Sequence, residues 1–166
     1  MSNQFTKTNY QLQSLKTGNI FADAGWTLDA PGETDPTLVR AIYEKKQLEV
    51  KDDSFGIYKF ADWLPVSRML QGSSAPVTYK SEGLAKELGL TNLWITFSGW
   101  WPEKGARFKT GSFKETEAYS VCGRMTPEMN KVLVVASAGN TARAFAKVCS
   151  DNNIPLLLCV PEDNLD

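Results

Sequence analysis

The sequence predicts an α/β domain built on an open, parallel-type sheet with flanking helices. Residues 131–136 (KVLVVA) and 154–162 (IPLLLCVPE) are continuous apolar runs, typical of strands buried on both faces of a parallel sheet. Between them, the small-residue turn SAGN leads into residues 141–153, whose apolar side chains recur at helical spacing from Ala142 to Cys149. Strand, turn, helix and strand in this order form a βαβ unit.

The composition is that of a globular protein without a nucleic-acid or membrane partner. The 166 residues suit one ordinary domain, with 42% hydrophobic and 22% charged residues. The net charge is −1, and no basic block is long enough to line a nucleic-acid groove. No apolar run approaches the length of a membrane span, and the first residues contain no apolar signal segment. We therefore expect a cytoplasmic protein.

The absence of histidine narrows the chemistry. It excludes Ser-His-Asp and Cys-His catalysis and most zinc sites. The cysteines, Cys122, Cys149 and Cys159, are odd in number and lack CxxC spacing, so we expect buried free thiols in a reducing compartment. Any catalysis must use lysine, carboxylates, hydroxyl groups or a cofactor.

The first part of the chain is turn-rich. Residues 18–35 predict short strand pieces between glycines. Asp35 and Pro36 offer an N-cap and a proline at the first helical position, which predicts a helix through residues 37–46. For residues 56–66 (GIYKFADWLPV), the aromatic and apolar pattern leaves strand and loop both open.

A helix and then a strand are predicted before the first candidate site. Ser81 precedes EGLAKELG, in which leucines stand one turn apart and Gly89 supplies the C-terminal stop. In residues 92–101 (NLWITFSGWW), every second residue from Leu93 is apolar, which is a strand pattern.

Lys114 lies at the predicted start of a helix. Ser112 and Glu115 have the S-x-x-E spacing of a capping box. Lys114 then sits in the first turn, where the positive end of the helix dipole disfavours a cation. This placement favours the neutral, nucleophilic amine that a Schiff base requires. Because capping boxes are common, an ordinary solvated lysine is the alternative.

A small-residue turn follows the first apolar run of the βαβ unit, and its residues are Ser137, Ala138, Gly139, Asn140 and Thr141. At the carboxyl end of a parallel strand and the N-terminus of a helix, such a turn can hold a carboxylate or phosphate. It matches neither the P-loop nor G-x-G-x-x-G, so a nucleotide or NAD site has little support. A simple strand-to-helix turn is the alternative.

A cluster of cations precedes Lys114. Lys104, Arg107 and Lys109 lie in a loop punctuated by glycine and proline. They can receive anionic substrates through charge-assisted hydrogen bonds, or they can simply be solvated.

Two motifs together resemble the fold-type II enzymes that use pyridoxal phosphate. The first is KTGSFKE (residues 109–115), and the second is ASAGNT (residues 136–141), whose serine lies 23 residues after Lys114. This group includes threonine synthase and has the fold of the tryptophan synthase β-subunit. The pair at this spacing is far more specific than either motif and favours a catalytic Lys114.

Within this group, residues 76–115 are similar to cysteate synthase, a relative of threonine synthase, and SGWWPEKGA (98–106) is the most telling stretch. Residues 10–23 resemble the opening of threonine synthases, which often carry Cys-x-x-Cys-Gly. Ser14 and Thr17 stand at those cysteine positions. The chain therefore departs from those relatives in having no zinc ribbon there, and we expect no metal site.

The resemblance implies a role for each residue of the two motifs. Lys114 would form the Schiff base with pyridoxal phosphate, and Asn140 would hydrogen-bond the 3-hydroxyl oxygen of its ring. The substrate carboxylate would be held by the rest of the turn, Ser137, Ala138, Gly139 and Thr141.

The implied reaction is a β-replacement. O-phospho-L-serine would lose phosphate to give an aminoacrylate, and sulfite would add to form L-cysteate, a precursor of coenzyme M. Phosphate and sulfite are both anions, which gives a purpose to Lys104, Arg107 and Lys109. Two alternatives stay open: threonine synthase, which uses O-phospho-L-homoserine and water, and a non-catalytic fragment of such an enzyme. We also expect a homo-oligomer.

Compared with this family, the chain divides at residue 80. Residues 1–80 resemble the N-terminal region of threonine synthase, and residues 81–166 resemble the start of the cofactor-binding α/β region. The family's loop for the cofactor phosphate, and its Ser/Thr facing the pyridine nitrogen, lie further downstream. The resemblance therefore implies an incomplete, truncated fold.

Overall fold

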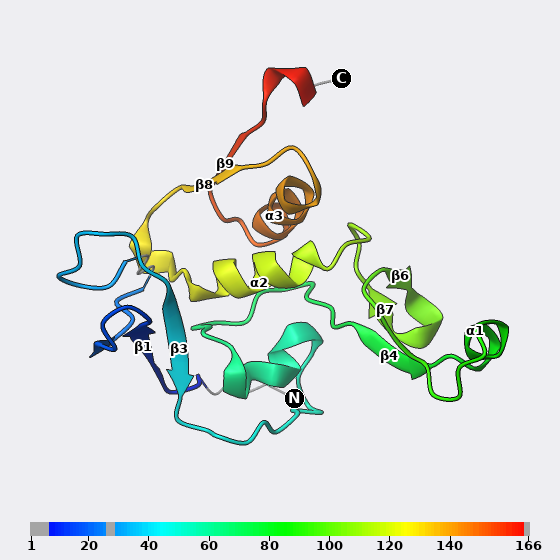
Figure 1. The fold of residues 1–166 in the computed structure, drawn as a ribbon. Coiled ribbons are helices and arrows are strands. Elements are labelled where there is room, and N and C mark those ends of the chain that lie inside the picture. The colour runs from blue at the N-terminus through cyan, green and yellow to red at the C-terminus, as the bar shows by residue number, and fades with distance from the viewer. Residues whose placement is uncertain (1–6, 26–28, 165–166) are drawn as a thin grey trace.

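The computed structural model describes residues 7–25 and 29–164 (Figure 1). It confirms that the fold mixes helices and strands, but the strands of these residues form four small sheets instead of one open sheet. Of the described strands, only β8 and β9 pair in parallel. The strands are β1 (Tyr10–Ser14), β2 (Ile20–Phe21), β3 (Val39–Tyr43), β4 (Val77–Lys80), β5 (Trp94–Phe97), β6 (Trp100–Trp101), β7 (Ala106–Arg107), β8 (Leu133–Ala136) and β9 (Leu156–Cys159).

Three α-helices and four 3₁₀ helices complete the described part of the chain. None of these helices is long and apolar enough to cross a lipid bilayer. They are η1 (Gly56–Trp63), α1 (Glu82–Glu87), η2 (Pro102–Lys104), α2 (Lys114–Arg124), η3 (Pro127–Met129), α3 (Asn140–Asp151) and η4 (Glu162–Asn164).

The N-terminal sheet corrects one prediction. The helix predicted for residues 37–46 is wrong, because β3 occupies that segment and pairs antiparallel with β1. The Tyr43 and Tyr10 rings lie 6.0 Å apart across this pairing. Its β-branched and aromatic residues suit a strand, and pairing with β1 outweighs the local Asp-Pro signal. Of the strand pieces predicted in residues 18–35, β2 forms, while residues 26–28 lie outside the described residues.

The turn after β1 is closed by hydrogen bonds. Ser14 is 1% exposed, and its Oγ accepts the backbone N–H groups of Lys16 and Thr17, each at 3.2 Å. The Thr17 hydroxyl donates to Glu33 at 2.6 Å. Gly18 adopts φ +75°, and its N–H donates to the Ser14 carbonyl at 3.0 Å. The hydroxyl groups of Ser14 and Thr17 therefore organise this turn.

The middle of the chain is mostly as predicted. The helix after Ser81 forms as α1, and Gly89 follows it with φ +66°. The strand in residues 92–101 forms as β5, which pairs antiparallel with β4. Residues 56–66, for which strand and loop were both open, instead form the 3₁₀ helix η1. The predicted boundary at residue 80 falls directly after β4, and the division stays a prediction.

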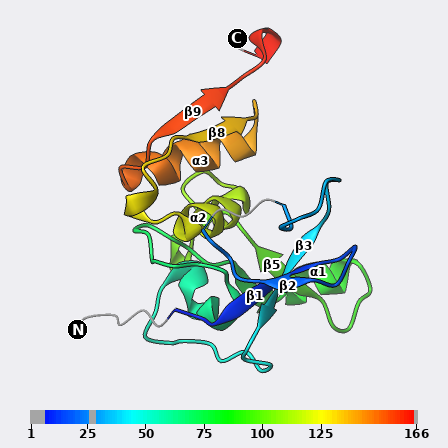
Figure 2. The same cartoon turned by 90° about the vertical axis from the view of Figure 1, so that its left-hand side faces the viewer.

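The core lies between α2, α3 and η1. Figure 2 shows α3 between α2 and the β8–β9 pair. Tyr58 of η1 is fully buried, and its hydroxyl accepts the Leu70 N–H at 2.9 Å. The Cys122 and Cys149 sulfurs meet at 3.8 Å between α2 and α3. The helix expected between the two apolar strands is confirmed as α3, with Phe145 among its buried residues.

The parallel pairing of β8 and β9 is confirmed, but their burial on both faces is not. Val134 is 59% exposed and Leu157 is 53% exposed. In each strand, every second residue is covered on the α3 side. One helix layer covers one face of a two-stranded sheet, so the outward-pointing side chains stay exposed in the described part of the chain.

The cysteines divide into two environments. Cys122 and Cys149 are buried free thiols, as predicted. The contact with Cys149, together with burial, raises the pKa of the Cys122 thiol. Cys159 is exposed, which corrects the prediction of a third buried thiol. It lies at the end of β9, where side chains alternate between the covered and the open face.

Thiol labelling of the native protein is expected to modify Cys159 rapidly, since thiolate access controls reactivity. Cys122 and Cys149 should react only after denaturant is added, because both are buried. A maleimide titration followed by mass spectrometry measures this difference. Rapid labelling that persists in Cys159→Ser would contradict the structure.

Candidate functional site

Lys114 is the first residue of α2. Its Nζ lies 2.5 Å from a Glu117 carboxylate oxygen and 5.3 Å from the centre of the Phe113 ring. The lysine side chain is 33% exposed. The amine is therefore reachable from solvent, as a covalent role requires, but it is held in an ion pair with Glu117.

The start of α2 corrects the predicted capping box. The Oγ of Ser112 accepts the Lys114 N–H at 3.2 Å, one residue earlier than a capping box requires. Glu115 is completely buried, and its carboxylate accepts the N–H of Thr110 instead of that of Ser112. Gly111, at φ +70°, turns the chain so that Thr110 presents this donor. The buried carboxylate thus fixes the loop that leads to Lys114.

The turn of residues 137–141 joins β8 to α3, as predicted. The Ser137 N–H donates to the Cys159 carbonyl at 3.0 Å, and its Oγ accepts the Gly139 N–H at 3.3 Å. Ala138, Gly139 and Asn140 are exposed, and α3 begins at Asn140. The turn is thus open to solvent at the helix N-terminus.

A hollow of about 320 Å³ lies beside this turn, at the carboxyl ends of β8 and β9. Its lining consists of Ala136, Ser137, Ala138, Cys159, Val160 and Pro161. The exposure of Cys159 was not predicted, because residues 154–162 were all expected to lie in the core. A period-two count along β9 is the signal that could have placed this thiol on the open face.

The structure brings together two of the three predicted cations. Arg107 and Lys109 line one hollow of about 310 Å³. Lys104 lies on η2, where its Nζ is 5.8 Å from the centre of the Trp101 ring. The other lining residues of that hollow are Phe55, Gln71, Gly72, Ser73 and Trp100.

Lys114 and the turn keep separate partners. Within residues 7–25 and 29–164, no hydrogen bond or ion pair joins Lys114 to residues 137–141. The two segments are linked through the packing of α2 against α3. The roles of Lys114 and of the turn residues stay predictions.

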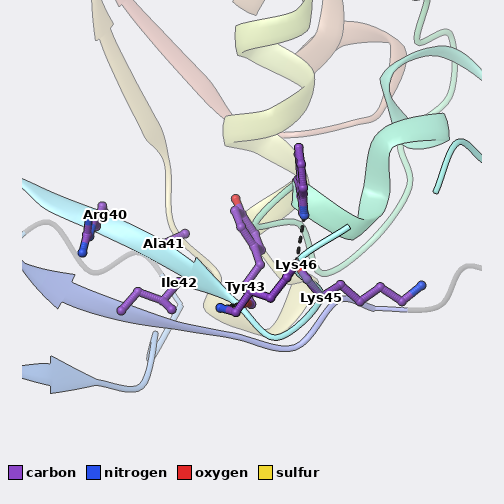
Figure 3. Close-up of a pocket in the computed structure, with 7 residues that line it drawn as sticks. Arg40, Ala41, Ile42, Tyr43, Lys45 and Lys46 are labelled. Carbon is purple, nitrogen blue, oxygen red and sulfur yellow. Dashed lines mark hydrogen bonds between the residues drawn. The ribbon is translucent and has the colours of Figure 1, made fainter. Parts of the chain in front are cut away.

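Another hollow, of about 320 Å³, lies along β3 and the turn after it (Figure 3). It is rich in cations, but each of them is engaged by the protein. Arg40 donates to Gln13, the Lys46 ammonium donates to the Tyr43 carbonyl, and Lys45 pairs with Asp62. Each cation that lines this hollow thus already has a partner among the described residues, and only Lys45 is paired with a carboxylate.

Curated proteins similar to this chain include several named cysteate synthase. One from Methanocorpusculum labreanum is 44% identical over 158 residues, which cover 95% of this chain and 38% of that protein. The chain is a sequence relative of cysteate synthases. Cysteate synthase from Methanosarcina acetivorans is 47% identical over 133 residues, covering 80% of this chain and 32% of that protein. Cysteate synthase from Methanococcoides burtonii is 51% identical over 132 residues, which cover 78% of this chain and 31% of that protein.

The chain spans little more than a third of the length of several of these cysteate synthases, at 36–38%. No family model matches it. No solved structure matches it either.

Proposed function

We propose that the protein carrying this chain is a pyridoxal phosphate enzyme of the cysteate synthase type. It would convert O-phospho-L-serine and sulfite into L-cysteate and phosphate. The observation that carries this proposal is the similarity to cysteate synthases over 95% of the chain, a span that includes Lys114 and residues 137–141. A fold-type II architecture, a homo-oligomeric assembly and a cytoplasmic location belong to the same proposal.

The described residues fit the cofactor chemically. A partly exposed lysine amine begins one helix, and an exposed turn begins the next. A Cβ atom built on Gly139 would meet nothing within 4 Å, so a ligand can reach the backbone there. Backbone N–H groups at a helix N-terminus bind anionic groups well. The pair of motifs thus offers a covalent attachment point and an anion cradle.

Each residue has a defined task in this proposal. Bound pyridoxal phosphate supplies an electron sink that makes the α-proton of an amino acid acidic. Lys114 would hold the cofactor and move that proton, and Asn140 would orient the ring through its side-chain amide. Ser137 and the backbone N–H groups of the turn would bind the substrate carboxylate. Because the Lys114 amine donates to Glu117, this ion pair has to separate before the amine can act.

Borohydride reduction tests the role of Lys114. In protein expressed from its full reading frame with pyridoxal phosphate, reduction is expected to add the cofactor's mass to the peptide containing Lys114. The visible absorbance should disappear at the same time. Lys114→Ala should lose both signals, while Lys131→Ala, which removes an exposed lysine outside the site, keeps them. Full-length protein without an adduct on Lys114 would contradict the proposed role.

Phosphate release tests the substrate. The protein would receive O-phospho-L-serine or O-phospho-L-homoserine, each with and without sulfite. We expect L-cysteate to form from O-phospho-L-serine only when sulfite is present. Phosphate release from O-phospho-L-homoserine and water would instead identify threonine synthase. An adduct on Lys114 without turnover of either substrate would indicate a non-catalytic protein.

A further inference from the structure

We propose that Arg107 and Lys109, together with the loop Gln71–Ser73, form a binding subsite for a small oxyanion of the phosphate or sulfite class. Lys104 is not part of this subsite. The identity of the anion rests on the proposed function, but the existence of the subsite does not. The argument starts from the hollow of about 310 Å³ that these residues share with Phe55 and Trp100.

One wall of the hollow is fixed by both core helices. The Gln71 N–H donates to Oδ1 of Asn152 at 2.8 Å. The Gln71 carbonyl accepts the Tyr119 hydroxyl at 3.1 Å and the Asn152 amide at 3.3 Å. Tyr119 belongs to α2, and Asn152 caps α3. The loop is therefore held in place without a ligand, so little ordering is needed when one binds.

The same wall presents bare backbone. Gly72 adopts φ +87°, and a Cβ atom there would lie 2.8 Å from the Tyr119 hydroxyl oxygen. The backbone conformation therefore disfavours a side chain here, and the Tyr119 hydroxyl would have to move to admit one. Among the described residues, the N–H groups of Gly72 and Ser73 have no hydrogen-bond acceptor. Such amides are suitable donors to an oxyanion.

The opposite wall supplies the charge. Arg107 stands on β7 beside Trp100 of β6, and its own N–H donates to the Ser74 hydroxyl at 3.1 Å. Within residues 7–25 and 29–164, neither Arg107 nor Lys109 forms an ion pair. Two cations that share a hollow without a paired carboxylate attract an anion.

One acidic group lies beside this wall: Asp151 Oδ2 would be 3.5 Å from a Cβ atom built on Gly72. Lys147 forms an ion pair with it and holds the pKa of the Asp151 carboxyl below its usual value, and Lys109 adds a smaller effect in the same direction. Because Lys147 neutralises this carboxylate, Lys109 keeps most of its attraction for a ligand. Lys104 faces Trp101 instead and is the matched cation outside the hollow.

Equilibrium binding of inorganic phosphate and of sulfite, each measured by calorimetry without pyridoxal phosphate, tests the proposal. Arg107→Ala and Lys109→Ala should each weaken binding about tenfold or more, as expected when a hydrogen bond to a charged group is lost. Lys104→Ala should bind like the unmodified chain, and Lys109→Arg should retain most of the affinity. Thermal unfolding of each variant separates lost binding from lost folding.

Competition between the two anions identifies the occupant. If phosphate and sulfite displace each other, the subsite serves both the leaving and the incoming group; if one anion alone binds, the subsite belongs to that anion. No binding of either anion to the folded chain, or equal weakening by Lys104→Ala, would overturn the proposal. Because no cofactor is used, such a failure leaves the Lys114 adduct untouched, and a missing adduct leaves the subsite standing.

Discussion

Replacing Gly56 with alanine is expected to lower the free energy of unfolding by about 3 kcal/mol or more, from combined backbone strain and overpacking. Gly56 adopts φ +55°, which disfavours any residue with a Cβ atom. The added methyl group would lie 2.5 Å from the carbonyl carbon and oxygen of Ser73. Backbone atoms cannot rotate away as a side chain can, so η1 and the Ser73 loop would have to separate.

Gly32→Ala is the matched control for this clash. Gly32 has φ +79°, but a Cβ atom there meets nothing within 4 Å. Gly32→Ala should therefore lower the free energy of unfolding only through backbone strain, by about 1–2 kcal/mol. Urea denaturation of both variants measures the difference. Equal losses would mean that η1 does not pack against Ser73 as described.

Removing the carboxylate of Asp23 is expected to lower the free energy of unfolding by about 3–5 kcal/mol. This is the range observed when one partner of a buried ion pair is removed. Asp23 Oδ2 lies 2.7 Å from the Arg124 guanidinium and 2.6 Å from the Tyr10 hydroxyl. The Asp23 side chain is 6% exposed and that of Arg124 is 22% exposed. Asp23→Ala would therefore leave a largely buried guanidinium without its counter-charge.

Two further variants separate charge from hydrogen bonding. Tyr10→Phe removes one hydrogen bond to the charged carboxylate and should lower the free energy of unfolding by about 1.5–3 kcal/mol. Asp23→Ala combined with Arg124→Met should recover part of the loss, because no unpaired charge remains. Chemical denaturation of the unmodified protein, these variants and Arg124→Met alone, five proteins in all, completes this comparison. A double variant as unstable as the sum of its single variants would show that the pair is not coupled.

Local patterns predicted the C-terminal half of the fold well. The βαβ unit, α1 and β5 each depend on periodicity and on end signals that lie within the element itself. The β3 segment failed, because its conformation is set by pairing with β1, about thirty residues earlier in the chain. The predicted open parallel sheet was too large. The prediction assumed that the apolar segments 131–136 and 154–162 are covered on both faces.

In the candidate site too, features marked by local motifs were predicted, and features that depend on distant contacts were not. Lys114 and Asn140 were predicted at helix starts, where the structure places them, since short motifs mark helix ends. The wall at Gln71 was missed, because it carries no motif and depends on contacts with Asn152, 81 residues away. Nothing local distinguishes Lys104 from Lys109, although the structure places only Lys109 beside that wall.

The shared core of α2 and α3 couples the two halves of the proposed cofactor site. Lys114 begins one helix and Asn140 begins the other, and the helices meet through Cys122 and Cys149. Neither residue can shift without moving a tightly packed helix. The distance between the two helix starts is thus set by the hydrophobic interior, so a change of a single methyl group there would shift the backbone of Lys114 relative to that of Asn140.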